Sequence, residues 1–230
     1  MTRRCMKDLD IFSALSHSER EQIGDLALKK TYRKNEPVFA EGAEADSIYL
    51  IKSGRVKLYK TSEDGKEFIL DYLKSEDIFG EVTFFENATH TMNAMAMEDT
   101  FICCCTKELF VKLLNNPQTA LKIVQYLGKK MNAYTEHMSH TAFKDVRGRV
   151  LGVLCRLAES YGTRTNAGLT ITLDLTHQDI GCLVNASRVM VTNVLGELRK
   201  EDLVHIEGHR ITLPVKCTTM YQNQTISENY

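Results

Sequence analysis

The sequence predicts an α+β protein built from three successive parts: a β-rich part, a long helix, and a compact helical part that ends in a hairpin. Three patterns lead to this fold class. Short β-rich segments fill residues 31–107, a heptad pattern runs through residues 117–143, and two short capped helices precede a hairpin within residues 176–213. The corresponding domain boundaries are 8–115, 116–144 and 145–213, with a tail at 214–230.

Composition places the chain among ordinary globular proteins. Of its 230 residues, 43% are hydrophobic and 26% are charged, which is enough material for two modest cores. The 29 basic and 30 acidic residues nearly cancel, so any surface that binds nucleic acid must be local. No apolar run approaches the ~18 residues of a membrane helix, and the N-terminus does not resemble a signal peptide. We therefore expect a cytoplasmic protein that does not bind membranes.

The first two elements are a helix and a set of strands. Residues 8–30 are predicted to be helical, because Ser16 and Ser18 stand before acidic residues, as helix N-caps do. From Thr31 the pattern changes to short β-rich segments, and residues 94–105 form the last of them. Asp64-Gly65 between two such segments indicates a tight hairpin. Many short strands at close spacing are typical of a small barrel or roll.

The long helix is predicted from Pro117 to Phe143, with Asn116 as its N-cap. Apolar or weakly polar residues recur at alternating spacings of four and three, at Ala120, Val124, Leu127, Met131, Tyr134, Met138 and Thr141. A seam this narrow favours a two-stranded coiled coil, and hence a homodimer. The alternative is a helix that packs only on its own domain.

The last part contains two short helices joined by a tight turn. It begins with a helix at Val146–Tyr161 and a strand at Leu169–Leu175. Thr176 and Ser187 are then positioned to cap the two short helices, and Asn185-Ala186 breaks the chain between them. A hairpin at residues 205–213, with Gly208 in its turn, follows as a wing. This arrangement predicts a helix-turn-helix whose second helix enters the major groove of DNA.

At this point the chain resembles a known family over nearly its whole length. The resemblance is carried by Arg55-Val-Lys-Leu-Tyr, Asp77-Ile-Phe-Gly80-Glu81, Asn116-Pro117, Phe143-Lys-Asp145-Val-Arg-Gly148-Arg149, Leu175-Thr176-His-Gln-Asp-Ile-Gly and Ser187-Arg188. These segments are similar to the Crp/Fnr regulators. The resemblance implies a double-stranded β-helix (jelly-roll) sensor, a dimerisation helix and a winged helix-turn-helix. It also implies a transcription regulator, not an enzyme, that is switched allosterically and works with RNA polymerase.

The resemblance also implies how DNA is read. Arg188 matches the family arginine that pairs with guanine, whereas Val189 stands where many members carry glutamate and Asn193 where many carry arginine. We therefore expect an inverted-repeat site whose half-sites are richer in A·T than those of the cyclic-AMP receptor protein. For Val189 and Met190 the alternative is simple packing. The candidate DNA-binding residues are Thr176, His177, Gln178, Ser187, Arg188, Val189, Thr192 and Asn193.

The sensor retains one half of the cyclic-nucleotide pattern. Glu81 matches the family carboxylate that holds a ribose, but Thr91 stands where an arginine would pair with the cyclic phosphate. A lysine or a helix N-terminus is the alternative source of positive charge. We therefore expect a small effector other than cyclic AMP, with an aromatic ring or a carboxylate. The candidate effector-binding residues are Gly80, Glu81, Val82, Thr91, Met92, Met131, Tyr134 and Thr135.

Other sensors on the same scaffold remain as alternatives. His90, with Met92, Met95 and Met97 nearby, is a candidate for haem. Thiol redox sensing is a further alternative and would use Cys103 to Cys105, or Cys182 on the first helix of the reading motif. No iron–sulfur cluster is expected, because Cys5 and Cys217 stand alone at the two ends, and no metal site of usual spacing occurs. A regulatory subunit that does not bind DNA is the rival function.

Overall fold

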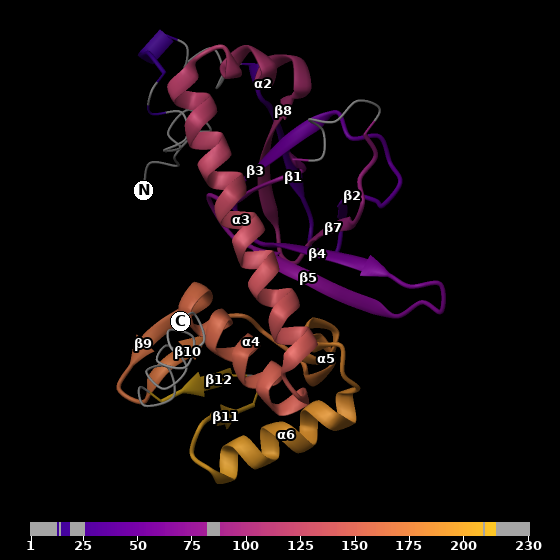
Figure 1. Ribbon diagram of the computed structural model, residues 1–230, viewed down its shortest axis with the longest axis vertical. Coiled ribbons are helices and arrows are strands. Elements are labelled where there is room, and N and C mark those ends of the chain that lie inside the picture. Colours follow the sequence, from indigo (N-terminus) through magenta and orange to yellow (C-terminus); the bar gives the residue numbers. More distant parts are fainter. Residues whose placement is uncertain (1–12, 14, 19–25, 82–87, 209, 215–230) are drawn as a thin grey trace. The chain divides into compact units, whose positions relative to one another are not determined.

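The computed structural model describes residues 13, 15–18, 26–81, 88–208 and 210–214. It consists of two compact units, Met1–Asn132 and Ala133–Tyr230, each of which is considered by itself (Figure 1). Among the described residues, no helix has the length and apolar character needed to cross a membrane.

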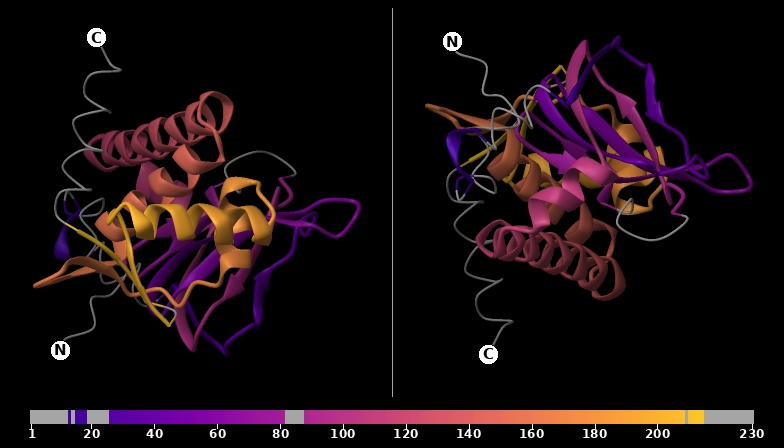
Figure 2. Two further views of the ribbon diagram at one scale, coloured as in Figure 1. Left: turned by 90° about the horizontal axis from the view of Figure 1, so that it is seen from below. Right: turned by 90° about the horizontal axis from the view of Figure 1, so that it is seen from above.

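Two four-stranded antiparallel sheets form the first unit. One has the strand order β1-β8-β3-β6 and the other has the order β2-β7-β4-β5. The strands of the first sheet are β1 (Leu28–Tyr32), β8 (Thr100–Thr106), β3 (Ser47–Ser53) and β6 (Ile78–Phe79). Those of the second are β2 (Pro37–Phe39), β7 (Asn93–Ala96), β4 (Val56–Thr61) and β5 (Glu67–Leu73). The β4–β5 hairpin projects from the rest of its sheet (Figure 2). The roll predicted from the sequence is confirmed.

Strands β3 and β8 at the centre of the first sheet are buried on both faces, and this explains their apolar sequences. Along β3, Ile48 and Leu50 belong to one core, while Tyr49 and Ile51 belong to the other. Successive side chains of a strand point to opposite faces. The core that contains Ile48 and Leu50 also includes residues of the helices that follow, such as Phe110 and Ile123.

Two boundaries in this unit differ from the sequence prediction. The predicted helix over residues 8–30 ends too late, because Leu28–Tyr32 is strand β1 and pairs with β8 from Leu28↔Cys104 to Tyr32↔Thr100. The local sequence pattern contains no information about a pairing partner that lies about seventy residues away in the chain. Residues 94–105, predicted as a continuation of one strand run, form β7 and β8, which belong to different sheets.

Two helices complete the unit. Helix α2 (Lys107–Leu114) was not predicted, whereas α3 (Pro117–Phe143) has the predicted bounds. The Asn116 side chain accepts from the backbone N–H groups of Gln118 at 3.1 Å and Thr119 at 3.2 Å, and so caps α3. Helix α3 runs from the first unit into the second.

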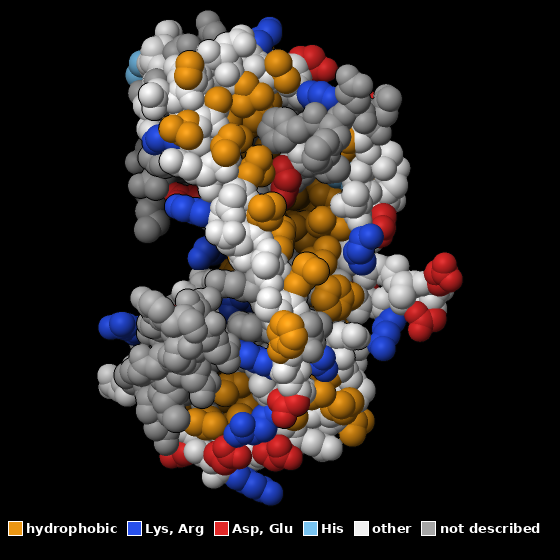
Figure 3. Space-filling view, viewed as in Figure 1, with side chains coloured by type: hydrophobic (Ala, Val, Ile, Leu, Met, Phe, Trp, Pro, Cys, Tyr) orange, Lys and Arg blue, Asp and Glu red, His pale blue; other side chains and the backbone are white. Residues whose placement is uncertain are grey.

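Helix α3 has a packed side and an exposed side. Ile123 is buried in the core beneath it, and Tyr126 and Leu127 pack against that core. A set of apolar residues on the other side is exposed, and we call it the α3 stripe: Leu121, Val124, Met131 and Met138. Hydrophobic side chains are visible along the course of the helix in Figure 3.

The second unit is built on helix α4 (Val146–Tyr161), whose bounds match the prediction. Asp145 caps it by accepting from the N–H of Gly148 at 2.7 Å. A four-stranded sheet has the order β11-β12-β10-β9. Its strands are β9 (Gly162–Thr165), β10 (Gly168–Ile171), β11 (His205–Glu207) and β12 (Arg210–Leu213). Strand β10 is shorter than the predicted Leu169–Leu175, and β9 was not predicted. Helices α5 (His177–Val184) and α6 (Arg188–Lys200) lie between β10 and β11 in the chain.

Candidate functional site

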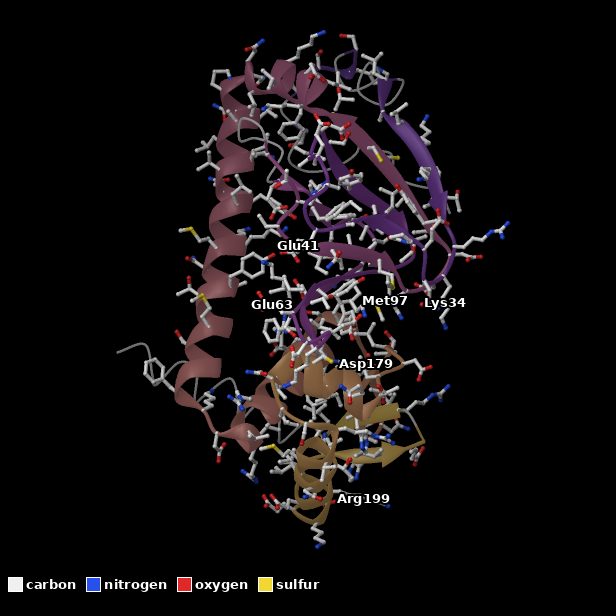
Figure 4. The ribbon with its side chains drawn as sticks, turned by 90° about the vertical axis from the view of Figure 1, so that its right-hand side faces the viewer. Lys34, Glu41, Glu63, Met97, Asp179 and Arg199 are labelled. Atoms are coloured by element: carbon white, nitrogen blue, oxygen red, sulfur yellow. The ribbon has the colours of Figure 1, made fainter. Side chains whose placement is uncertain are left out.

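Helix α5 begins with a complete capping box. The Thr176 hydroxyl accepts from the N–H of Asp179, and the Asp179 carboxylate accepts from the N–H of Thr176 at 2.9 Å. Figure 4 shows Asp179 at this end of α5. Two of the helix's otherwise unpaired N-terminal donors are therefore satisfied, which fixes where α5 starts.

The turn between α5 and α6 depends on two residues. Asn185 adopts the left-handed conformation, with φ of 49°, and ends α5. A Cβ atom at Gly181 would lie 2.6 Å from the carbonyl oxygen of Ala186, so a larger residue there would push the turn away. Asparagine tolerates the left-handed region better than most residues. These two positions keep the helices close at the turn.

Helix α6 is divided into a buried and an exposed side. Ser187 caps it by accepting from the N–H of Met190 at 3.2 Å. Val191, Val194, Leu195 and Leu198 are buried beneath it. Val189 is 68% exposed and Met190 is 46% exposed, so packing does not account for either residue. Arg188, Thr192 and Asn193 are also exposed.

Several of the predicted DNA-binding residues lie around one cavity. A cavity of about 490 Å³ is lined by Thr176, His177, Gln178 and Arg188 and by wing residues that include Ile206 and Gly208. His177 Nδ1 lies 2.8 Å from Thr192 Oγ1, which links the start of α5 to α6. The Thr192 hydroxyl also donates to the carbonyl of Arg188 at 2.9 Å. Polar groups thus surround the N-terminal ends of both helices.

In the first unit, Glu81 has a lysine partner that the sequence prediction missed. Lys130 Nζ on α3 lies 2.8 Å from Glu81 Oε1 and also donates to the Ile78 carbonyl at 3.2 Å. The hydroxyl of Tyr126 donates to the same carbonyl at 2.8 Å. The Lys130 side chain is only 16% exposed. We call Ile78, Gly80, Glu81, Tyr126 and Lys130 the Glu81 cluster.

The backbone conformation at position 80 of this cluster requires glycine. Its φ is +85°, and a Cβ atom there would lie 2.7 Å from the ring of Tyr49. Nearby, burial raises the pKa of Asp77 above its usual value, although the N–H of Lys74 and the charges of Lys74 and Lys130 act in the opposite direction. The cluster is therefore tightly packed, and its charged groups are only partly exposed to water.

The other predicted effector residues are more scattered. Thr91 is exposed, and Met92 packs against the core between the sheets. Met131 is 68% exposed on the α3 stripe. Tyr134 and Thr135 belong to the part of α3 in the second unit, and Val82 lies outside the described residues.

His90 lies in an aromatic cluster. Its ring stacks on Phe39 with centroids 3.6 Å apart and planes 4° apart, and Tyr49 lies at 6.1 Å. Only 2% of His90 is exposed, and burial lowers its pKa. Met97, labelled in Figure 4, follows β7 in the turn before β8. Among the described residues, no group of three or more His, Cys, Asp or Glu side chains could hold a metal ion.

The cysteines on β8 are buried thiols. Cys103 and Cys105 lie in one core and Cys104 in the other, as the alternation of a strand predicts. Burial raises the pKa of Cys104 to about 11 and that of Cys105 to about 12. Because the thiolate is the reactive form, these two thiols are unreactive at neutral pH. Cys182 on α5 is partly exposed and accepts from the Gln178 amide at 3.6 Å.

Comparison with known proteins agrees with both halves of this description. Residues 29–116 match the cyclic nucleotide-binding domain, and residues 148–215 match the Crp-like helix-turn-helix domain. The chain is 30% identical over 195 residues to the global nitrogen regulator of Synechococcus elongatus, covering 83% of this chain and 87% of that protein. The chain belongs to the Crp/Fnr family. It is a DNA-binding transcription regulator, and the family relationship excludes an enzyme.

Other proteins are similar at lower sequence identity. The CRP-like cAMP-activated global transcriptional regulator of Mycobacterium tuberculosis is 28% identical over 183 residues, covering 79% of this chain and 82% of that protein. Among solved structures, the c-di-GMP responsive global regulator CLP of Xanthomonas campestris has a TM-score of 0.74 at 24% identity, covering 86% and 99% of the two chains. A CooA mutant from Carboxydothermus hydrogenoformans has a TM-score of 0.73 at 26% identity, covering 86% and 88%.

Proposed function

We propose that this Crp/Fnr regulator is a homodimer that reads an inverted repeat through α6, and that a small effector other than cyclic AMP controls it. The observation that carries the proposal is the exposed side of α6. Arg188 can pair with both acceptors of a guanine, and Val189 presents an apolar surface that suits a thymine methyl group. RNA polymerase is the expected second partner of the DNA-bound protein.

The α3 stripe supports the homodimer. Val124, Met131 and Met138 follow one another at intervals of seven residues, and each is at least 64% exposed. Apolar residues at a strict seven-residue interval form one of the two rows that make the seam of a left-handed coiled coil. A second copy of α3 would cover this stripe, while Ile123 and Leu127 hold each helix on its own sheet. Two reading helices related by two-fold symmetry would then require an inverted repeat.

The Glu81 cluster supports a small effector. The relatives named above are described as responding to cAMP or to c-di-GMP, so the scaffold accommodates different molecules. Here the anion-pairing arginine is replaced by Thr91, and Lys130 is the cation next to Glu81. An effector that offers a hydroxyl or amine to Glu81 and an anionic group to Lys130 would replace their mutual ion pair. Its binding would thereby act on α3 through Lys130.

The arrangement of side chains is less suited to the two alternatives, a haem sensor and a thiol redox sensor. A haem bound by His90 would have to displace Phe39, whose ring lies 3.6 Å from that of His90. Redox sensing at β8 would need thiolates, which the raised pKa values of Cys104 and Cys105 disfavour. Cys182 has the better exposure of the described cysteines, but no second thiol of the described residues accompanies it on α5.

The DNA part of the proposal is tested by selecting bound sequences from random duplexes with the full-length protein. We expect an inverted repeat with A·T-rich half-sites. The variant Arg188→Ala should lose the selected preference but retain weak binding at low salt, because phosphate contacts do not depend on sequence. Arg199→Ala, on the last turn of α6, is the matched control. Selection that yields no repeat, or an unchanged preference in Arg188→Ala, would contradict the proposal.

The effector part is tested by calorimetry with a defined panel: cAMP, c-di-GMP, and aromatic carboxylates with and without a hydroxyl group. We expect a hydroxylated carboxylate to bind and cAMP not to bind. Lys130→Met should abolish binding, and Glu81→Ala should weaken it. If cAMP binds with unchanged affinity in Lys130→Met, this part of the proposal is wrong and the DNA part stands.

A further inference from the structure

A chain of hydrogen bonds joins the two helices of the reading motif. His177 Nδ1 lies 2.8 Å from Thr192 Oγ1, and Thr192 Oγ1 donates to the Arg188 carbonyl at 2.9 Å. The hydroxyl of threonine has a single proton, and a carbonyl can only accept. The threonine proton is used in the bond to the Arg188 carbonyl. Both hydrogen bonds can therefore form together only when His177 Nδ1 carries a proton and donates it to Thr192 Oγ1. This assignment leaves Nε2 as the imidazole nitrogen whose protonation can change.

We propose that Thr192 is a positioning residue that holds the proton of His177 on Nδ1, so that His177 binds a DNA phosphate only in its protonated form. The inference rests on the proposed function, because it assumes that α5 and α6 meet DNA. It goes further in assigning a distinct role to each residue of the pair. His177 contacts the phosphate, and Thr192 acts through His177.

The physical basis is the state of Nε2. With the proton held on Nδ1, a neutral imidazole presents the lone pair of Nε2, which repels a phosphate oxygen. Protonation places a hydrogen and a positive charge there, so that Nε2 donates a charge-assisted hydrogen bond. Without Thr192 the neutral ring can carry its single proton on Nε2 and can donate without being charged. The hydroxyl of Thr192 therefore converts an ordinary contact into one that depends on pH.

The surroundings of His177 leave the ring open to a phosphate. Thr192 is its hydrogen-bond partner among the described residues, and the ring lines the cavity of about 490 Å³. From α6, Arg188 is the charged group on this cavity, and its positive charge also attracts phosphate. From α5, the Asp179 carboxylate is occupied by Thr176. The wing contributes the apolar residues Ile206, Gly208 and Ile211, and no described residue of α4 lines the cavity.

The test measures DNA affinity of the full-length protein against pH. The probe is a mixed-sequence duplex of about 30 base pairs at low salt, because a phosphate contact does not depend on the base sequence. Histidine side chains ordinarily change charge between about pH 5 and 8, so fluorescence anisotropy is recorded across that window. The histidines outside this pair contribute a background, which His177→Ala measures.

We expect the wild-type affinity to fall about tenfold more than that of His177→Ala between about pH 6 and 8. Thr192→Val, which has the same shape without the hydroxyl, should lose most of this additional fall by binding better at high pH. Thr192→Ser, which restores a hydroxyl, should regain it. A merely structural role of Thr192 would weaken binding equally at every pH.

Each result decides the proposal. Equal pH profiles of the wild type and His177→Ala would overturn it, as would a Thr192→Val variant that keeps the wild-type profile. Failure to bind any duplex at any pH would instead contradict the proposed function. Binding that is strong and independent of pH would leave the proposed function intact and would refute this inference alone.

Discussion

The helix-turn-helix of the second unit and the Glu81 cluster of the first are held in place by different kinds of contacts. In the helix-turn-helix, the caps and the turn join residues within five positions of each other, as in the pairs Thr176–Asp179 and Ser187–Met190, and the contact between His177 and Thr192 spans 15 positions. In the Glu81 cluster, the partner of Glu81 is 49 positions away on α3. The first arrangement presents fixed groups to an external partner. The second links a loop to a distant helix, which suits a group whose contacts change on binding.

The largest expected effect concerns the buried side of α6. Leu195 is 1% exposed beneath α6, so Leu195→Ala should lower the free energy of unfolding by about 2–5 kcal/mol through lost burial and a new cavity. Urea denaturation followed by circular dichroism measures the change. Asn193→Ala, on the exposed side of the same helix, should change stability by less than about 0.5 kcal/mol. Similar losses in both variants would show that α6 is not divided as described.

A second change addresses the Glu81 cluster. Gly80→Ala places a methyl group against Tyr49 and forces a left-handed backbone on alanine, so we expect a loss of about 2 kcal/mol. Thermal unfolding measures it. Gly65→Ala is the matched control: its φ is also positive, at +79°, but nothing lies within 4 Å of its Cβ position. The difference between the stability losses of the two variants measures the cost of the steric clash with Tyr49. Equal losses would mean that only the left-handed backbone is costly and that the clash is not.

The local contacts of the helix-turn-helix should each have smaller effects. Ser187→Ala removes the cap of α6 and Thr176→Ala that of α5, and each should cost about 1 kcal/mol. The same urea titration detects both. Ser187→Asp and Thr176→Asp keep a capping oxygen and should restore most of the stability. No loss in the alanine variants would mean that the caps do not determine where these helices begin.

The smallest expected effect is a pH dependence from His90. Burial lowers its folded-state pKa below the unfolded value, so the unfolded chain binds the proton more readily. Stability from this group is therefore present at neutral pH and is lost as the pH falls below the ordinary histidine pKa of 6.5. His90→Phe should lose less stability than the wild type between about pH 7 and 5. An identical acid sensitivity of the two proteins would contradict this assignment.

The same difference in contacts explains what could be predicted. The bounds of α3 and α4, and the N-caps Thr176 and Ser187, were predicted from the sequence because a cap and a periodic face lie within a few residues of each other. Lys130 was missed as the partner of Glu81, because nothing in a single sequence relates positions 49 apart. Residues 28–30 of strand β1 were predicted as helix for the same reason: the partner strand β8 lies far along the chain.

The division of α6 into a buried and an exposed side has a consequence for the diversification of regulators. Val191, Leu195 and Leu198 secure the helix from below, while Arg188, Val189 and Asn193 take no part in that core. The outward residues can therefore be exchanged without dismantling the scaffold. A library varied only at these three positions should yield well-folded proteins with new operator preferences. This chain is therefore a suitable starting point for regulators that do not bind each other's operators.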